Sequence, residues 1–145
     1  MTSQTETLSP TSGPEAGEAR TRVVLVDARA DRRSVMRQVF EHSGVDAAVV
    51  GEADGGTDAV ALVEQHRADL AVVELPLPVA DGLAAVAALR RRFPDLAIVV
   101  ISFNTDVAVK EQAKAEGADA YLVKPVNARE VVAAMPDTPR TATGL

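Results

Sequence analysis

The chain has 145 residues and an apolar fraction of 47%, which is enough for one domain with its own core. A formal net charge of −6 argues against nucleic acid as a partner, and no apolar run approaches the roughly 20 residues that span a bilayer. The absence of cysteine excludes disulfides and thiolate metal sites and is typical of a reducing compartment, so we expect a cytoplasmic protein without membrane insertion.

The two ends of the chain have a composition that cannot form a core. Residues 1–20 consist almost entirely of Ser, Thr, Pro, Gly and acidic residues, and residues 137–145 are similar. Such segments bury too little apolar surface to offset the entropy of ordering them. We therefore expect a disordered tail at 1–20, one folded domain at 21–136 and a second disordered tail at 137–145.

Between the tails, short apolar runs alternate with stretches of helical periodicity. The strands are predicted at 23–27, 46–53, 70–74, 96–102 and 119–124, and the helices at 31–44, 56–67, 82–93, 105–116 and 127–135. Asp31 and Asp81 are placed as helix N-caps. The first helix should turn one apolar face toward the core, made of Val35, Met36, Val39 and Phe40.

This strict alternation predicts about five strand–helix pairs. Strands that are apolar along their whole length are buried on both faces, which indicates a parallel sheet with helices on each side, a doubly wound α/β sandwich. Function in such folds is found at the carboxyl ends of the strands. The polar residues there are Asp27, Glu74, Ser102 and Lys124.

These residues and the segments around them resemble the receiver domain of bacterial two-component response regulators. The matching segments are VVLVDARADRR, VVGEADGG, DLAVVELPLPVADGL, VVIS and EGADAYLVKP, and the resemblance runs from Arg22 to about Met135. It implies a flavodoxin-like (βα)5 sandwich, with five parallel strands in the order 2-1-3-4-5. It also implies phosphorelay signal transduction through protein–protein interaction rather than enzymatic activity, and a stand-alone receiver that acts on other proteins.

The resemblance assigns site roles to four residues and shows two departures. It matches the family's first acid, hydroxyl, switching aromatic and lysine, in that order, with Asp27, Ser102, Tyr121 and Lys124. Ala28 stands where the family has a second acid, and Glu74 stands where the family has the aspartate that accepts a phosphoryl group. The phosphoacceptor-equivalent residue is therefore a glutamate.

Both departures should damage phosphoryl transfer. The resemblance implies that Mg²⁺ is held by an acid from the first strand, the phosphoacceptor and a main-chain carbonyl, here that of Pro76. Ala28 removes one ligand, and Glu74 moves the other carboxylate by about 1.5 Å, one carbon–carbon bond. Misplacement by about 1 Å can cost about a hundredfold in rate. We expect signalling that is independent of aspartyl phosphorylation and no cofactor. Any residual Mg²⁺ binding, through Asp27, Glu74 and the Pro76 carbonyl, should be weak.

Several alternatives stay open. A direct ion pair with Lys124 could satisfy Glu74, which would then either imitate a phosphorylated aspartate or be a remnant without a signalling role. Asp27 could cap local backbone amides, Ser102 could bond its own loop, and Tyr121 could be a rim residue that does not switch. The whole chain could also be a conventional phosphorelay receiver that uses Mg²⁺ at a modified site. A flavodoxin-like cofactor binder is a third alternative, although DARADRR lacks the glycines of a phosphate loop.

The family resemblance also implies where a partner docks. The expected face is built from the fourth helix, the fifth strand and the fifth helix, and the partner is another protein: a sensor kinase, a regulator or a complex subunit. Homodimerisation stays open as well. The fourth helix is polar, with a narrow apolar stripe of Val109 and Ala113, so it should be held loosely to the core.

Overall fold

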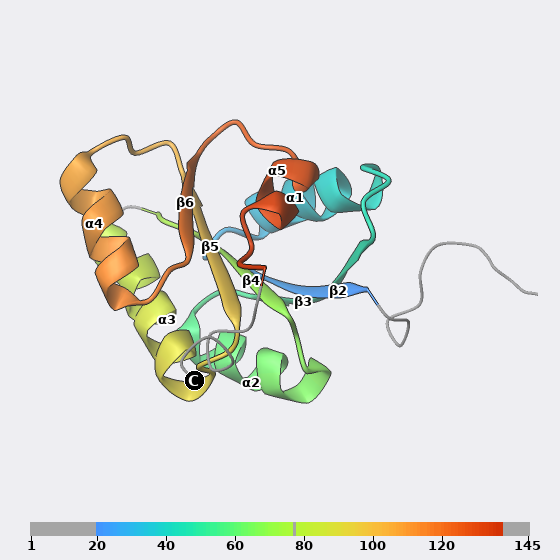
Figure 1. Ribbon diagram of the computed structural model, residues 1–145, viewed down its shortest axis with the longest axis horizontal. Coiled ribbons are helices and arrows are strands. Elements are labelled where there is room, and N and C mark those ends of the chain that lie inside the picture. Colours follow the sequence, from blue (N-terminus) through green and yellow to red (C-terminus); the bar gives the residue numbers. More distant parts are fainter. Residues whose placement is uncertain (1–19, 77, 138–145) are drawn as a thin grey trace, which may run out of the picture.

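The computed structural model describes residues 20–76 and 78–137. It contains a five-stranded parallel sheet with helices on both faces (Figure 1). The predicted tails lie outside the described residues except for Arg20 and Asp137. The predicted doubly wound α/β architecture is confirmed.

All neighbouring strands of the sheet pair in parallel. The strands are β2 (Thr21–Val26), β3 (Ala47–Ala53), β4 (Leu70–Glu74), β5 (Ala97–Ser102) and β6 (Ala120–Val123). Their spatial order is β3-β2-β4-β5-β6, which is the predicted order 2-1-3-4-5 when the strands are counted along the chain. The chain therefore reverses its winding direction between β2 and β4, the point where doubly wound sheets place their functional sites.

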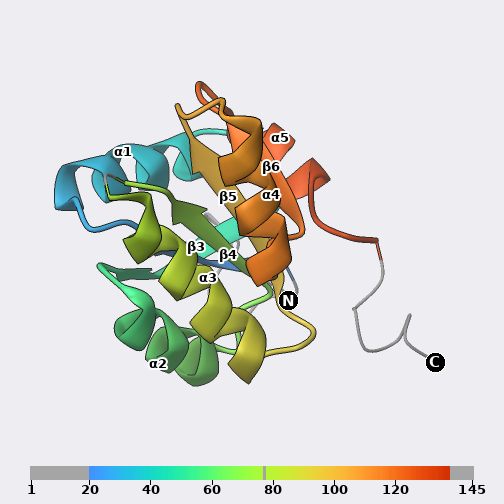
Figure 2. The same cartoon turned by 90° about the vertical axis from the view of Figure 1, so that its left-hand side faces the viewer.

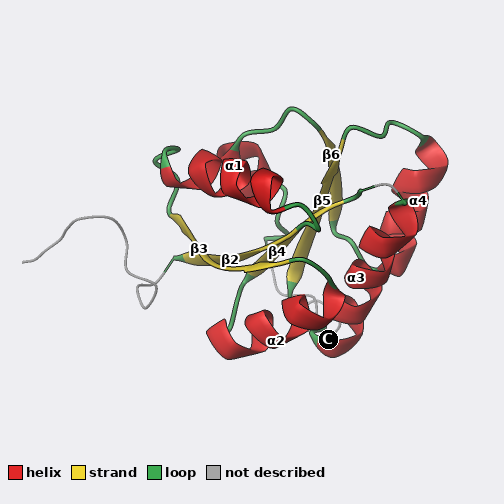
Figure 3. Ribbon diagram, turned by 180° about the vertical axis from the view of Figure 1, so that it is seen from behind, coloured by secondary structure: helices red, strands yellow, loops and turns green. Residues whose placement is uncertain are grey.

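The helices cover both faces of this sheet. They are α1 (Ala30–Glu41), α2 (Gly56–His66), α3 (Val79–Arg92), α4 (Val107–Glu116) and α5 (Ala128–Ala133). Helices α1 and α5 lie on one face, and α2, α3 and α4 lie on the other (Figure 2). Figure 3 shows the sheet between α1 and α2. None of the described helices is long and apolar enough to cross a bilayer.

The core forms two layers because successive strand residues point to opposite faces. Val24 and Val73 belong to the layer under α2, α3 and α4, whereas Leu25 and Val72 belong to the layer under α1 and α5. Every residue of β4 is buried, including Glu74 at its end. The carboxylate of Glu74 is thus placed where water cannot freely solvate it.

Both predicted N-caps are wrong. α1 begins at Ala30 with Arg29 as its cap residue, and α3 begins at Val79 with Pro78 as its cap residue, so Asp31 and Asp81 lie in first turns. Aspartate is favourable in either place because both are close to the positive end of the helix dipole. Whether such an aspartate is the N-cap or lies in the first turn depends on where the chain leaves the sheet. The helix sequence alone does not determine that point.

One residue of the predicted apolar face of α1 is not buried. Phe40 is 2% exposed, and Met36 and Val39 pack against the same core layer, as predicted. Val35 is 61% exposed. It lies at the rim of a groove between α1 and the loops that follow β5 and β6, where nothing in the described chain covers it.

Gly82 allows α3 to approach the loop that follows Glu74. A Cβ atom at Gly82 would lie 3.2 Å from the Leu75 Cα and 3.1 Å from the Pro76 Cδ, closer than ordinary contacts. The Leu75 side chain is 5% exposed and has little room to move away. Glycine at this position therefore sets the path of the chain directly after the carboxylate.

We predict that Gly82→Ala lowers the free energy of unfolding by about 1–3 kcal/mol, because the added methyl group forces backbone shifts in a packed region. This loss should occur although alanine has the better helix propensity. Gly55→Ala is the matched control, since a Cβ atom there meets nothing within 4 Å. Urea unfolding of the three proteins measures the effect. Equal stabilities of the two variants would show that the loop adapts freely.

Candidate functional site

The polar residues that end the strands converge at one edge of the sheet. Asp27 directly follows β2, Glu74 ends β4, Ser102 ends β5 and Lys124 directly follows β6. Asp27, Glu74 and Ser102 are all buried, with exposed fractions of 6%, 6% and 2%. Because all the strands run parallel, their carboxyl ends meet at this edge, as the sequence predicted.

Glu74 and Lys124 form a bidentate ion pair. The Lys124 ammonium donates to both carboxylate oxygens, with Nζ 2.7 Å from Oε1 and 2.8 Å from Oε2. The Lys124 side chain is 16% exposed. The ion pair that the sequence left open is therefore present, and it engages both oxygens of the Glu74 carboxylate.

A second cation approaches the same carboxylate. The Arg32 guanidinium, on the first turns of α1, lies with Nη1 3.5 Å from Glu74 Oε2. Burial raises the pKa of the Glu74 carboxyl above its ordinary range, and Lys124 opposes this rise. The negative charge of Asp27 raises the pKa further, and Arg32 opposes it. Asp27 and Glu74 thus face two cations, Lys124 and Arg32.

Asp27 contacts the backbone that follows it. Its Oδ1 accepts a hydrogen bond from the Arg29 main-chain N–H at 2.9 Å. Its main-chain carbonyl accepts a hydrogen bond from Arg33 Nη1 at 2.5 Å. This is the geometry of a residue that caps the turn between β2 and α1, one of the two roles left open by the sequence.

The residues at this edge do not fit an octahedral Mg²⁺ ion. Mg²⁺ requires near-ideal oxygen geometry at roughly 2.0–2.1 Å. Ala28 offers no side-chain oxygen, and both Glu74 oxygens already accept hydrogen bonds from Lys124. Among the described residues, no group of three or more His, Cys, Asp or Glu side chains is arranged to hold a metal ion. The chemistry that such an ion would supply is therefore not assigned to this site.

Ser102 and Tyr121 hold the loop between β5 and α4 at a single residue. Asn104 donates its main-chain N–H to Ser102 Oγ at 3.0 Å. The Tyr121 hydroxyl donates to the Asn104 main-chain oxygen at 2.7 Å. The Asn104 side chain in turn accepts from the Asp106 N–H at 2.9 Å, and Asp106 caps α4. This chain of hydrogen bonds connects two of the predicted site residues to the start of α4.

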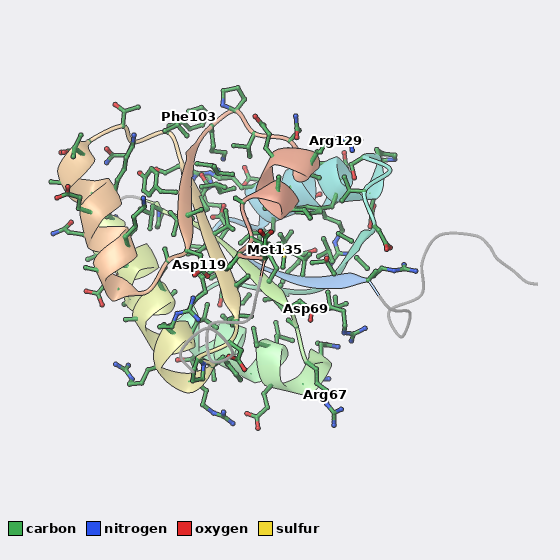
Figure 4. All side chains as sticks on the ribbon, viewed as in Figure 1. Arg67, Asp69, Phe103, Asp119, Arg129 and Met135 are labelled. Atoms are coloured by element: carbon green, nitrogen blue, oxygen red, sulfur yellow. The ribbon has the colours of Figure 1, made fainter. Side chains whose placement is uncertain are left out.

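Two cavities flank the Glu74–Lys124 pair. One of about 280 Å³ lies toward α2 and α3 and is lined by Asp27, Glu74 and Pro76, among others. The other, of about 330 Å³, lies between α1 and the loops after β5 and β6 and includes Lys124 and Phe103. Phe103 is 71% exposed and lies at the carboxyl edge of the sheet (Figure 4). Glu74 thus lines an acidic cavity, and Lys124 lines a largely apolar groove.

The fold agrees with comparisons to known proteins. The sequence model of the response regulator receiver domain matches residues 23–136, most of the chain. The chain belongs to the response regulator receiver domain family. The matched range lies within the predicted domain at 21–136 and favours the receiver interpretation over a flavodoxin-like cofactor binder.

Among relatives of this receiver domain, the transcriptional regulatory protein PdtaR of Mycobacterium tuberculosis is 33% identical over 128 residues. The match covers 87% of this chain and 60% of PdtaR, so the chain spans a little over half the length of that relative.

Two solved structures show the same fold. The signal receiver domain of NarL from Mycobacterium tuberculosis is 32% identical, with a TM-score of 0.66 and coverage of 79% of this chain and 92% of that one. A LuxR-family two-component response regulator from Aurantimonas sp. SI85-9A1 is 27% identical, with a TM-score of 0.69 and coverage of 79% and 81%.

The sequence-based site omitted Arg32 and Phe103. A signal for Arg32 was available, because a helix that begins directly after Asp27 must place its first turn at the same sheet edge as Glu74. Arg29, Arg32 and Arg33 follow at spacings of three and one residues. Which of these arginines turns toward Glu74 depends on the helix start, and α1 begins one residue earlier than predicted. Phe103 carries no pattern that distinguishes it from an ordinary loop residue.

Proposed function

We propose that this chain is a receiver that acts in signal transduction through protein–protein interaction, independently of aspartyl phosphorylation. The observation that carries the proposal is the Glu74 carboxylate, whose two oxygens are held by Lys124 at 2.7 and 2.8 Å. A phosphoryl group would need one of these oxygens as its nucleophile and Lys124 as a partner for its own oxygens. Here the acceptor and the lysine neutralise each other.

The hydrogen bonds around Asn104 support a receiver that stays in one state. Ser102 and Tyr121 are the residues that the family resemblance links to switching, and both are engaged with the same loop residue. A phosphoryl group on the acceptor would compete for the Ser102 hydroxyl. Without it, the loop before α4 keeps its position, and the surface presented by α4 is constant.

We propose that the partner docks on the face formed by α4, β6 and α5. Val107 on α4 is 65% exposed and Val123 on β6 is 38% exposed, and these are large apolar side chains on adjacent elements. Ala113 is the one α4 residue that is fully buried among those described. The helix therefore presents most of its surface outward beside β6, with Lys110 over the Tyr121 ring at 5.9 Å.

Two substitutions on this face should abolish docking without unfolding the chain. We expect Val107→Asp combined with Val123→Asp to remove capture of the native partner from host lysate, since both places are exposed but apolar. Glu41→Lys on α1 is the control, because Glu41 is exposed and its i,i+4 contact with Arg37 is long at 3.7 Å.

The same capture assay tests independence from phosphorylation. We expect equal capture with and without acetyl phosphate and Mg²⁺. Capture that requires the phosphodonor would contradict the proposed function. Capture that fails with Glu41→Lys and survives the α4–β6 substitutions would move the docking face to α1.

A further inference from the structure

Arg32 is the residue of α1 that reaches across to β4. Its side chain is 39% exposed, whereas Glu74 is 6% exposed, so the guanidinium extends from the surface to a buried carboxylate. Lys124 reaches the same carboxylate from the end of β6. Glu74 is therefore held by one cation from α1, the helix that follows β2, and one from the end of β6. In the sheet order, β2 and β6 lie on opposite sides of β4.

The other arginines of this segment form ion pairs with carboxylates other than Glu74. Arg32 is therefore the arginine of α1 that pairs with Glu74. Because the neighbouring arginines have other partners, this contact is not a chance approach by one of several mobile side chains. The pairs are Arg29 with Asp31, Arg33 with Glu52, and Arg37 with Glu52 and Glu41.

The charges at the site balance without a metal ion. The groups that face Glu74 are the cations Lys124 and Arg32 and the carboxylate of Asp27. A receiver with a full acidic pair has three carboxylates against one lysine, a surplus that a divalent cation must neutralise. Here one carboxylate is lost at Ala28 and one cation is gained at Arg32.

We propose that Arg32 is a built-in counter-ion that takes over the neutralising role of the divalent cation and closes a two-cation clamp on Glu74. The inference rests on the proposed function, because a clamped carboxylate is what makes the site independent of phosphorylation. Arg32 is a positioning residue: it acts on Glu74 and touches no reacting group. Its effect is electrostatic and directional, so a lysine at the same place should retain part of it.

A double-mutant cycle in the full chain tests the clamp. Arg32→Met should lower the folding equilibrium constant about two- to tenfold when Glu74 is present, the range for coupled, partly buried charges. In a Glu74→Gln background the same substitution should change it less than about twofold, since only a directly interacting pair is non-additive. Arg32→Lys should restore part of the coupling. Arg29→Met is the matched control and should show equal effects in both backgrounds.

A second readout separates the charge of Arg32 from any packing role. In the Ala28→Asp, Glu74→Asp background, adding Arg32→Met should tighten Mn²⁺ binding about tenfold, because a fixed positive charge near the ion is removed. Arg29→Met should leave Mn²⁺ affinity within about twofold, since Arg29 is paired with Asp31 at the surface.

Zero coupling between Arg32 and Glu74 would overturn the inference whatever the metal result, and so would equal Mn²⁺ affinity with and without Arg32. Neither measurement uses a phosphodonor. A wild-type chain that proved to be phosphorylated would therefore contradict the proposed function without bearing on the coupling between Arg32 and Glu74. Zero coupling in a chain that stays unphosphorylated would contradict the clamp and leave the proposed function standing.

Discussion

Replacing Ala28 and Glu74 together by aspartate should give a chain that takes a phosphoryl group from acetyl phosphate, with release of acetate, whereas we expect the wild-type chain to stay unlabelled. Ala28→Asp restores a carboxylate ligand beside Asp27, and Glu74→Asp draws the acceptor back by about 1.5 Å. The shorter side chain should also end the bidentate contact that Glu74 makes with Lys124. Ser102 and Lys124 are already at the same edge of the sheet to receive the phosphoryl oxygens.

Each single variant, Ala28→Asp or Glu74→Asp, should take up about a hundredfold less phosphoryl label than the double variant. Phosphoryl transfer depends on positioning and on neutralisation of charge, and a misplacement of about 1 Å removes about that factor. The metal ion needs a carboxylate oxygen from position 28 and one from position 74, and the acceptor needs the metal ion. The effects of the two substitutions are therefore not additive. Ala28→Asn with Glu74→Asp is the matched control, with the shape of the restored site but without its second charge.

Quantitative mass spectrometry after treatment with acetyl phosphate and Mg²⁺ measures this result, and the label should be lost in alkali. A double variant that stays unlabelled would show that features beyond positions 28 and 74 prevent the reaction. Strong labelling of the Ala28→Asn control would show that the second acid is not the missing ligand.

Lys124→Met should lower the free energy of unfolding by about 3–5 kcal/mol, the usual cost of removing one partner of a buried ion pair. The substitution leaves a carboxylate that is 6% exposed with only the longer contact to Arg32 at 3.5 Å. Urea unfolding measures the effect. Lys110→Met should change stability by less than about 0.5 kcal/mol, because the Lys110 ammonium forms no ion pair among the described residues and lies 5.9 Å from the centroid of the Tyr121 ring.

The loss caused by Lys124→Met should depend on pH. Burial raises the pKa of Glu74 in the folded chain, so the ionised carboxylate disfavours folding at pH values above that raised pKa. Without Lys124 this penalty is larger. Lowering the pH toward the ordinary glutamate pKa of about 4.3 protonates Glu74 and should recover most of the lost stability. Adding Glu74→Gln to Lys124→Met should recover the lost stability at neutral pH. If neither the lower pH nor Glu74→Gln recovers it, the loss comes from packing rather than from the unpaired carboxylate.

The sheet and the convergence of the site could be predicted from the sequence because both follow from local patterns. Strands that are apolar along their whole length must be buried on both faces, and their parallel order brings Asp27, Glu74, Ser102 and Lys124 to one edge. The Glu74–Lys124 pair follows from that edge and from the extra carbon of glutamate.

The contacts made by α1 could not be predicted in the same way. The exposure of Val35 and the approach of Arg32 to Glu74 depend on how the helix is rotated against the sheet. Asp31 satisfies the rules for an N-cap, although it lies two residues past Arg29, which caps α1. A shift of one residue rotates a helix face by about a quarter of a turn or more, given 3.6 residues per turn.

The most direct test of the account is the intact mass of the wild-type chain after incubation with acetyl phosphate and Mg²⁺, measured beside the Ala28→Asp, Glu74→Asp variant. The account predicts that the wild-type mass is unchanged, because both oxygens of Glu74 are held by Lys124 and no residue replaces the missing acid at Ala28. A wild-type chain that gains one phosphoryl group at Glu74 would contradict it.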